Sequence, residues 1–312
     1  MMHCLANVRG VPHPIPYQGS KRWIAKSILS CIPDGTRRLL EPFAGSAAVS
    51  LAAAYYSKVD SFYLNDINTP LIDLWAEIID RPEALSGMYE RLWHQQVGRE
   101  REFYDQIRAR FNEKHEPHCL LYLLARCVKA AIRYNTKGEF NNSPDNRRKG
   151  SLPQTMRANI GAASDLLRGR SQLARQDYKA ILKLAEPSDV VYMDPPYQGV
   201  CGSRDQRYLK AVPFDEFVHN LAELNRRGIP HIVSYDGRCG SKTYGQPLPA
   251  SLEATHIEVD AGTSSQGTLL GRNERTIESL YLSPEIMKRI GRIPHSLGPR
   301  PAQQELGFGG ES

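Results

Sequence analysis

The 312-residue sequence lacks the features of several specialised protein classes. Its six cysteines include no C-x-x-C pair, so we expect buried or unreactive thiols, with no disulfide framework and no metal site. The longest apolar-looking stretches, Ala47 to Tyr56 and Cys119 to Ala125, fall well short of the roughly 20 residues that span a bilayer. Residues 1–10 lack the continuous apolar segment of a signal peptide. These absences predict a cytoplasmic protein without a membrane segment.

Phosphate-binding signatures are absent as well. The sequence contains no G-x-G-x-x-G spacing and no G-K-[ST], so neither a pyrophosphate-binding turn nor a P-loop is indicated. It also contains no internal repeat. A nucleoside-like ligand that needs no phosphate site remains compatible with the sequence.

The net charge is modest but unevenly distributed. Forty Lys and Arg against 34 Asp and Glu give +6. The segment from Leu121 to Lys183 holds 13 basic and four acidic residues, a charge of +9, which leaves −3 for the remainder. Such asymmetry fits a segment that binds a polyanion, or a solvated basic face. Charge alone does not separate the two.

Strand and helix patterns alternate near the N-terminus. Arg37 to Phe43 is a short apolar run typical of a strand, Ala44 to Ser46 forms a glycine turn, and Ala47 to Tyr56 is alanine-rich and helical. Ser61 to Asp66 predicts a second strand, and Thr69-Pro70 opens another helix. This alternation is typical of a doubly wound, mostly parallel α/β sheet.

The alternation is then interrupted. Residues 82–135 have helical periodicity throughout, and Asn135 to Pro153 is a long polar loop of the kind that is often functional. Further elements are expected at Tyr178–Leu184 (helix), Asp189–Met193 (strand), Phe214–Arg227 (helix), Pro230–Ser234, Ala254–Asp260 and Thr276–Leu282 (strands). We therefore predict a discontinuous catalytic domain (11–80 and 171–283), a helical insert (81–170), and a flexible tail (284–312) that contributes little to the core.

The first chemical motif is Glu41 to Ser46. Gly45, at a strand-to-helix turn, lets the backbone approach a ligand, and Phe43 can pack on a flat ring. Asp66 ends the next strand, 21 positions after Gly45, where an acid can accept hydrogen bonds from ribose hydroxyls. Tight turns also carry glycine for packing reasons, and an acid can simply form a turn, but the two features together favour a nucleoside site.

The second motif is Asp194-Pro195-Pro196-Tyr197, which follows an apolar strand. Successive prolines remove backbone donors and fix φ, so the Asp194 carboxylate and the Pro195 carbonyl become rigid acceptors with the Tyr197 ring alongside. That set suits a planar ring bearing an amino group, because two acceptors can bind its two N–H groups while the aromatic ring stacks on its face.

These motifs resemble those of the S-adenosylmethionine-dependent amino-methyltransferases. Their order resembles the α group typified by the DNA adenine methylase family (D12 class). Pro16 to Lys21 (PYQGSK) is similar to the family's aromatic-x-Gly-small-Lys motif, and Arg133 to Asn141 (RYNTKGEFN) to its R-Y-N-x-x-G-x-F-N segment. The similarity runs from about Pro16 to Leu282. Residues 142–146 lack the Pro-x-Gly turn with which the family commonly continues, so its usual recognition sequence is not carried over.

The resemblance implies a seven-stranded methyltransferase sheet and a set of site residues. It assigns catalysis to Asp194, Pro195 and Tyr197. DNA binding would fall to Arg133, Tyr134, Asn135, Lys137, Phe140 and Asn141. The cofactor S-adenosylmethionine would contact Tyr17, Lys21, Phe43, Gly45, Asp66 and Asp194.

The predicted activity is methylation of adenine N6 in double-stranded DNA, by base flipping and direct attack of the amine. None of the cysteines has the Pro-Cys context of a cytosine-C5 enzyme. Alternatives are an amino-methyltransferase acting on cytosine N4, RNA or protein amides, and a non-catalytic DNA-binding regulator. We further expect a monomer, associated with the nucleoid through DNA, that could pair functionally with a restriction endonuclease.

Overall fold

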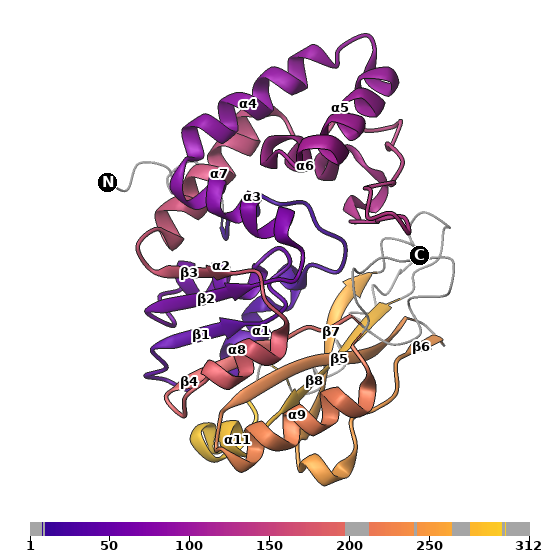
Figure 1. Cartoon of the computed structure of the whole chain (residues 1–312). Helices are drawn as coiled ribbons and strands as arrows, with labels where there is room; N and C mark the ends of the chain where they lie inside the picture. The colour runs from indigo at the N-terminus through magenta and orange to yellow at the C-terminus, as the bar shows by residue number, and fades with distance from the viewer. Residues whose placement is uncertain are drawn as a thin grey trace, which may run out of the picture.

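The computed structural model describes residues 8, 10–196, 212–239, 242–263, 275–294 and 297. A single sheet occupies the lower half of Figure 1, and a group of helices stands above it. The strands are β1 (Arg38–Glu41), β2 (Ser61–Asn65), β3 (Ser171–Ala174), β4 (Asp189–Met193), β5 (His231–Cys239), β6 (Lys242–Tyr244), β7 (Thr255–Thr263) and β8 (Arg275–Leu282).

Strand order confirms the predicted mostly parallel α/β sheet. Strands β3, β2, β1, β4 and β5 lie side by side in that order and run parallel. Strands β8 and β7 extend the sheet antiparallel, and the short β6 pairs with β5 beside this seven-strand path. The order reverses direction between β1 and β4. Open α/β sheets bind their ligands at the carboxyl ends of the strands beside such a switch point.

Helices cover both faces of the sheet, so the central strands are apolar on both sides. In β1, Leu39 belongs to the core on one face and Leu40 to the core on the other, as the two-residue repeat of a strand requires. The first core includes α1 (Ala25–Ser30), α2 (Ala48–Tyr55) and α3 (Thr69–Asp80). The second includes α8 (Tyr178–Leu184) and α9 (Phe214–Arg226).

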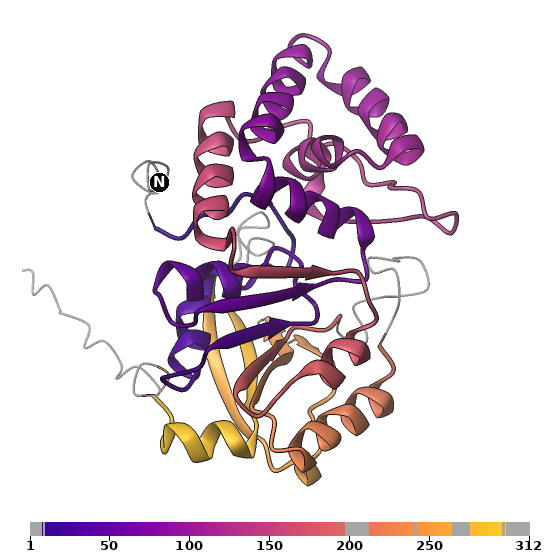
Figure 2. The same ribbon diagram turned by 60° about the vertical axis from the view of Figure 1, so that its left-hand side comes forward.

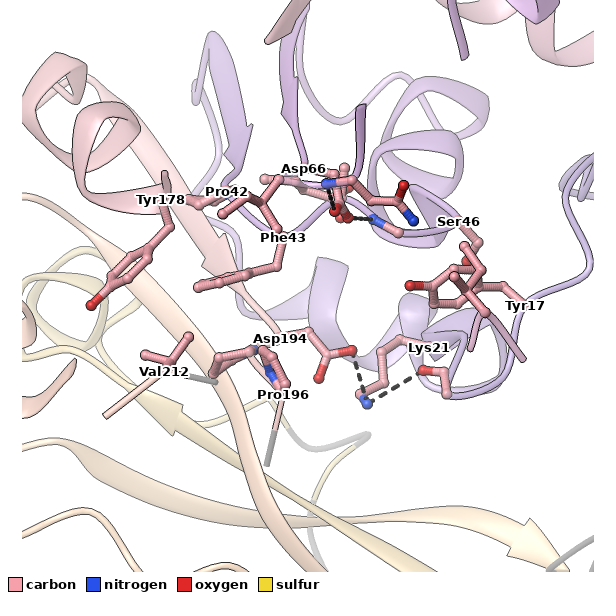
Figure 3. A pocket seen from close by; sticks show the side chains of 18 of the residues that line it. Tyr17, Lys21, Pro42, Phe43, Ser46, Asp66, Tyr178, Asp194, Pro196 and Val212 are labelled. Carbon is pink, nitrogen blue, oxygen red and sulfur yellow. Dashed lines mark hydrogen bonds and ion pairs between the residues drawn. The ribbon is translucent and has the colours of Figure 1, made fainter. Parts of the chain in front are cut away.

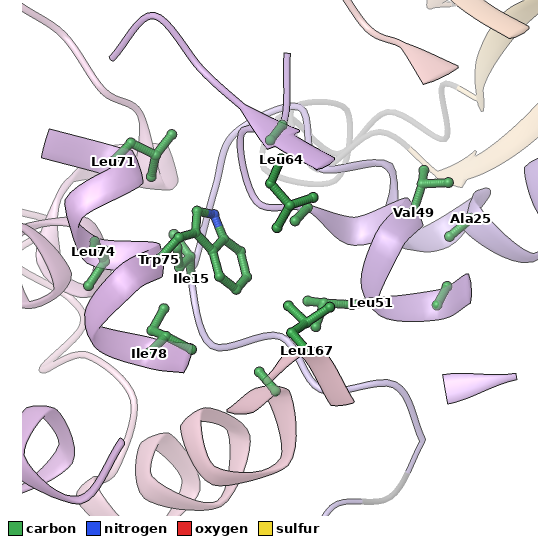
Figure 4. Packing of buried hydrophobic residues seen from close by; sticks show 14 of the residues in the cluster. Ile15, Ala25, Val49, Leu51, Leu64, Leu71, Leu74, Trp75, Ile78 and Leu167 are labelled. Atoms are coloured by element: carbon green, nitrogen blue, oxygen red, sulfur yellow. The ribbon is translucent and has the colours of Figure 1, made fainter. Parts of the chain in front are cut away.

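Helix α3 joins the sheet to the helical insert. Figure 4 shows Trp75 of α3 directed into the space between Leu51, Leu64 and Leu167. The hydrophobic core continues from there into the insert without a break, so the insert shares the core of the sheet. The insert helices, seen at the top of Figures 1 and 2, are α4 (Pro82–Gln95), α5 (Glu100–Lys114), α6 (Pro117–Arg126) and α7 (Pro153–Leu167).

Three expectations are corrected. The continuous helical periodicity over 82–135 is wrong at its end, because α6 stops at Arg126 and the chain is extended at Cys127. Lys129 and Ala130, within and just after the turn η3 (Val128–Ala130), take positive φ values of 59° and 51°. Tertiary bonds hold this departure: the Asn142 amide donates to the carbonyls of Val128 and Ala131 at 3.0 and 2.9 Å.

Strand β3 was not anticipated. It is a four-residue edge strand whose exposed Gln172 and half-buried Ser171 and Leu173 give little apolar alternation. Its pairing with β2 defines it.

The tail prediction is also wrong in part. Residues 284–290 form α11 (Pro284–Ile290), in which Ile286 is fully buried and the Ser283 hydroxyl caps the first turn. The start of the predicted tail therefore belongs to the core.

Within the described part of the chain, no helix is long and apolar enough to cross a bilayer. Cys31, Cys119 and Cys127 are buried free thiols, as expected. Burial raises the pKa of Cys31 and Cys127 to about 11 and that of Cys119 to about 12, so all three remain protonated and poorly reactive at neutral pH.

Candidate active site

A cavity of about 210 Å3 lies at the carboxyl ends of β1, β2 and β4, beside the switch point. Its walls come from segments far apart in the sequence, namely residues 17–21, 41–49, 66–68, 132–134, 176–178, 192–196 and 212–216. Figure 3 shows side chains from these segments surrounding one space. The cavity therefore brings together both motifs and the N-terminal PYQGSK segment.

The turn after β1 forms one wall. Gly45 has φ +49°, and a Cβ atom there would lie 3.2 Å from Cε1 of Tyr17, so the position favours glycine on both counts. The Gly45 N–H donates to Oδ2 of Asp66 at 3.0 Å, and the Trp75 indole N–H donates to the Gly45 carbonyl at 2.9 Å. The turn is thus fixed by contacts from three other segments.

Asp66 follows β2 and accepts two backbone hydrogen bonds, from Gly45 to Oδ2 and from Asn68 to Oδ1 at 2.9 Å. Burial raises the pKa of Asp66, and the two N–H donors oppose that rise. Each carboxylate oxygen has a second lone pair, so the group can still accept hydrogen bonds from hydroxyls entering the cavity.

Asp194 lies directly after β4, at the opening of the second motif. The Lys21 ammonium is 7% exposed, lies 3.0 Å from Asp194 Oδ2 and 3.6 Å from Glu278 Oε2, and also donates to the Gly19 carbonyl at 3.4 Å. Figure 3 shows Asp194 and Lys21 facing each other across the lower part of the cavity. The buried ammonium neutralises the Asp194 carboxylate and fixes its direction.

Aromatic rings form the opposite side. Phe43 stacks on Tyr178 with ring centroids 5.1 Å apart and an interplanar angle of 29°. The Tyr178 hydroxyl bonds to Glu216 Oε1 at 3.2 Å and accepts from the Asn220 amide at 3.1 Å. The α9 helix thereby holds the aromatic pair in place, and a flat ring entering the cavity would meet a rigid apolar surface.

The cavity is strongly acidic. Among its described lining residues, Glu41, Asp66, Asp177, Asp194 and Glu216 carry carboxylates and only Lys21 carries an ammonium. Glu41 accepts from the Ser50 N–H at 2.7 Å, and burial, aided by the nearby Asp194 charge, raises the pKa of Glu41 to about 7. Such a lining favours a cationic ligand rich in hydrogen-bond donors and repels phosphate groups.

The predicted cofactor residues all line this cavity: Tyr17, Lys21, Phe43, Gly45, Asp66 and Asp194. Of the predicted catalytic residues, Asp194 and Pro195 line it too, whereas Tyr197 lies outside the described residues.

Sequence reasoning missed other wall residues. Asp177, Tyr178 and Glu216 had no recognisable motif, although Asp177 is the N-cap of α8 and accepts from the Lys179 N–H at 3.1 Å. An N-cap acid after a glycine-free strand was the one available signal.

Arg133 to Asn141 forms a hairpin, visible as a narrow projection after α6 in Figure 2. Backbone bonds join its two arms: Asn135 donates to Glu139, and Asn141 donates to Arg133, both at 2.9 Å. Gly138 turns the chain with φ +77°. The Asn112 side chain of α5 accepts from the Phe140 N–H at 2.8 Å and donates to its carbonyl at 3.1 Å, which ties the hairpin to the insert.

The predicted DNA-binding residues divide into two groups. Lys137 and Asn141 are exposed, and Arg133 and Asn135 are half-buried, so all four are accessible to a ligand. Phe140 and Tyr134 are only 1% and 8% exposed and pack edge to face with centroids 6.2 Å apart. For these two, the expectation of direct DNA contact is corrected: their rings build the hairpin, because no other apolar groups support its arms.

The +9 segment is not a uniform basic surface. Arg168 and Arg170 donate to backbone carbonyls of Ile79, Val59 and Asp60, and Arg126 is buried. Other basic residues pair with carboxylates, Arg157 with Glu83 and Glu90 and Arg175 with Asp73. The exposed cations of the hairpin and the two flanking loops are Lys129, Lys137, Arg147, Arg148 and Lys149.

Possible metal-ligand atoms gather at one place in the described chain, Glu116, His118 and Cys119 at the start of α6. The Glu116 carboxylate is already bound by both nitrogens of Arg110 at 2.5 and 2.8 Å. This group lies outside the cavity lining.

Fold and cavity together define a Rossmann-like methyltransferase architecture with a nucleoside-type pocket. Residues 17–264 match the D12 class N6 adenine-specific DNA methyltransferases, and the chain belongs to that family.

Individual relatives are similar over parts of their length. The chain is 28% identical over 232 residues to a DNA N-6-adenine-methyltransferase of Escherichia phage P1, covering 71% of this chain and 29% of that protein. It is 30% identical to the retron Ec67 DNA adenine methylase of Escherichia coli, covering 59% and 63%. It is 28% identical to the type II methyltransferase M1.LlaDCHI of Lactococcus lactis subsp. cremoris, covering 58% and 64%. The chain thus spans less than two thirds of each of these relatives.

Proposed function

We propose that this protein transfers the methyl group of S-adenosylmethionine to N6 of adenine in double-stranded DNA. The observation that carries the proposal is the position of Asp194, whose carboxylate is fixed by buried Lys21 at 3.0 Å and faces an acidic cavity that also contains Asp66. The family and the printed names of the relatives support the same chemistry.

The cavity fits the proposed cofactor in chemical terms. Asp66 offers acceptors for ribose hydroxyls, Phe43 offers a flat apolar surface for adenine, and the excess of carboxylates suits a sulfonium and an ammonium. When bound, S-adenosylmethionine would supply an electrophilic methyl group. A phosphate-bearing cofactor would meet carboxylates with no compensating arginine among the described lining residues.

The chain's own residues would act by position and electrostatics. The exocyclic amine of adenine is a poor nucleophile because its lone pair is delocalised into the ring. Asp194 would accept one N–H of that amine and the Pro195 carbonyl the other, which favours a pyramidal, more nucleophilic nitrogen. The base would leave the helical stack to reach this site, and the proposal includes direct transfer without a covalent protein intermediate.

DNA would lie against the hairpin and its flanking loops. Arg133, Asn135, Lys137 and Asn141 are the proposed hairpin contacts, and exposed Arg147 and Arg148, 76% and 77% exposed, would contact phosphates. Function as a monomer, a nucleoid-associated location in the cytoplasm, and pairing with a restriction endonuclease are part of the proposal. The type II methyltransferase among the relatives supports that last point.

The decisive experiment combines the purified chain, S-adenosylmethionine with a labelled methyl group, and duplex DNA, followed by digestion to nucleosides. We expect label in N6-methyladenine, and at least a 10²-fold lower rate for Asp194→Ala with retained DNA binding. Label in N4-methylcytosine, or only in added RNA or protein, would replace the proposed substrate. Cofactor and DNA binding without any transfer would indicate a binding module.

A further inference from the structure

The root of the DNA-facing hairpin is also a wall of the cofactor cavity. Tyr134, in the first arm of the hairpin, lines the same cavity as Gly45 and Asp66. The ring is 8% exposed, packs against Phe140, and is joined to the second arm through the Tyr134–Phe140 backbone bridge. A displacement of the hairpin arms would therefore move Tyr134 within the cavity wall.

A chain of hydrogen bonds runs from Tyr134 to the cofactor side. The Tyr134 hydroxyl donates to Oδ1 of Asn68 at 3.2 Å, bridging 66 positions of sequence. The Asn68 N–H donates to Oδ1 of Asp66 at 2.9 Å, and the Gly45 N–H donates to Oδ2 of the same carboxylate. Burial raises the pKa of Tyr134 to about 12, so its hydroxyl remains a donor throughout the neutral range.

The chain is buried and has a fixed direction. Asn68 is 7% exposed and precedes α3, whose first turn bonds to the Asn68 carbonyl through the N–H groups of Leu71 and Ile72 at 3.0 and 3.3 Å. Trp75, one turn further along α3, donates to the Gly45 carbonyl. Asn68 is therefore held at both ends, and its side chain cannot follow Tyr134 without disturbing Asp66 or α3.

We propose that Tyr134 and Asn68 are positioning residues that couple DNA binding at the hairpin to cofactor binding at Asp66. The inference rests on the function proposed above. Each ligand would order one end of the same hydrogen-bonded chain, so each would increase the affinity for the other by the same factor, as thermodynamic linkage requires. The coupling would favour the complex in which both substrates are present.

The test measures this factor directly. Affinity for duplex DNA is determined with and without S-adenosylhomocysteine, and affinity for S-adenosylhomocysteine with and without DNA. Tyr134→Phe removes one hydroxyl and keeps the ring. We expect it to reduce the coupling factor by about threefold to tenfold, the effect of one buried hydrogen bond, while DNA affinity without cofactor changes less than about twofold.

Tyr104→Phe is the matched control. Its hydroxyl is equally buried and donates to the Asn142 carbonyl at 3.0 Å, directly after the hairpin, without leading to Asp66. A reduction of coupling no larger than that of Tyr104→Phe would overturn the proposal, as would a wild-type coupling factor near one. Failure of the wild type to bind either ligand would instead count against the proposed function itself.

Asn68→Ala cuts the chain at its second member while keeping the backbone N–H that bonds to Asp66. It should reproduce the effect of Tyr134→Phe, and the double variant should lose no further coupling, since both remove the same connection. Hydrogen exchange gives an independent readout: cofactor should slow exchange of the hairpin amides of Asn135 and Asn141 in the wild type and not in Tyr134→Phe. Additive effects on coupling, or unchanged protection, would contradict the chain.

Discussion

Glu41 allows the most quantitative test of the cavity's electrostatics. It is 2% exposed at the end of β1, and burial raises its pKa from 4.5 to about 7. Each pKa unit corresponds to about 1.4 kcal/mol, so the displacement represents a free-energy cost of about 3 kcal/mol for the ionised side chain in the folded protein.

The sign of the pH dependence follows from proton binding. Between pH 4.5 and about 7, Glu41 is protonated in the folded chain and ionised in the unfolded chain. The folded state therefore binds more protons, and the free energy of unfolding falls as pH rises through this window. Below pH 4.5 Glu41 makes no pH-dependent contribution, and above pH 7 the loss is complete.

Glu41→Gln isolates this contribution. The amide oxygen can still accept the Ser50 N–H that now donates to Oε1 at 2.7 Å, and the side chain keeps its size. We expect the variant to equal the wild type in stability near pH 4.5 and to exceed it by up to about 3 kcal/mol at pH 8.

Urea denaturation at several pH values between 4.5 and 8.5 measures the difference between the two proteins, in which the other titrating groups largely cancel. A difference that is independent of pH would refute the reasoning, because it would mean that Glu41 titrates alike in the folded and unfolded chains. A variant less stable at pH 8 than at pH 4.5, relative to wild type, would reverse its sign.

Three further outcomes are expected. Gly45→Ala should weaken binding of S-adenosylmethionine at least about tenfold in calorimetry, because the left-handed φ of +49° and the Tyr17 ring 3.2 Å away both oppose a Cβ; unchanged affinity would contradict the assigned turn. Asp66→Asn leaves one backbone N–H without an acceptor, so cofactor affinity should fall by about 10-fold to 100-fold, with wild-type binding as the contrary result. The double variant Arg147→Ala, Arg148→Ala should reduce the slope of log DNA affinity against log salt by about 2, and an unaltered slope would remove both from the DNA surface.

What the sequence predicted well was local chemistry at strand ends. Strands β1 and β4 are buried on both faces and therefore appear as short apolar runs, and the motifs that follow them are placed by the switch point. Their convergence on one cavity follows from the parallel order alone. Edge strand β3 escaped prediction because its residues alternate weakly and only pairing with β2 makes it a strand.

Other features depend on contacts that no local pattern encodes. Helical periodicity continues past Arg126, yet Asn142, 16 residues later, supplies bonds that replace the helical ones. Phe140 and Tyr134 lie in a segment that resembles a DNA-binding motif, and only the fold shows that their rings support the hairpin. The raised pKa of Glu41 likewise arises from burial and from Asp194, about 150 positions away.

The distribution of charge gives the two proposed substrates separate places. The cavity concentrates carboxylates around Lys21, whereas exposed cations lie on the hairpin tip at Lys137 and on the adjoining loop at Arg147 and Arg148. A phosphate backbone is attracted to the loops and repelled from the cavity, and a sulfonium is attracted to the cavity. Only the neutral target base can pass from one region to the other without electrostatic cost. The site can therefore admit an extruded base between Asp194 and the hairpin root while the DNA backbone stays outside.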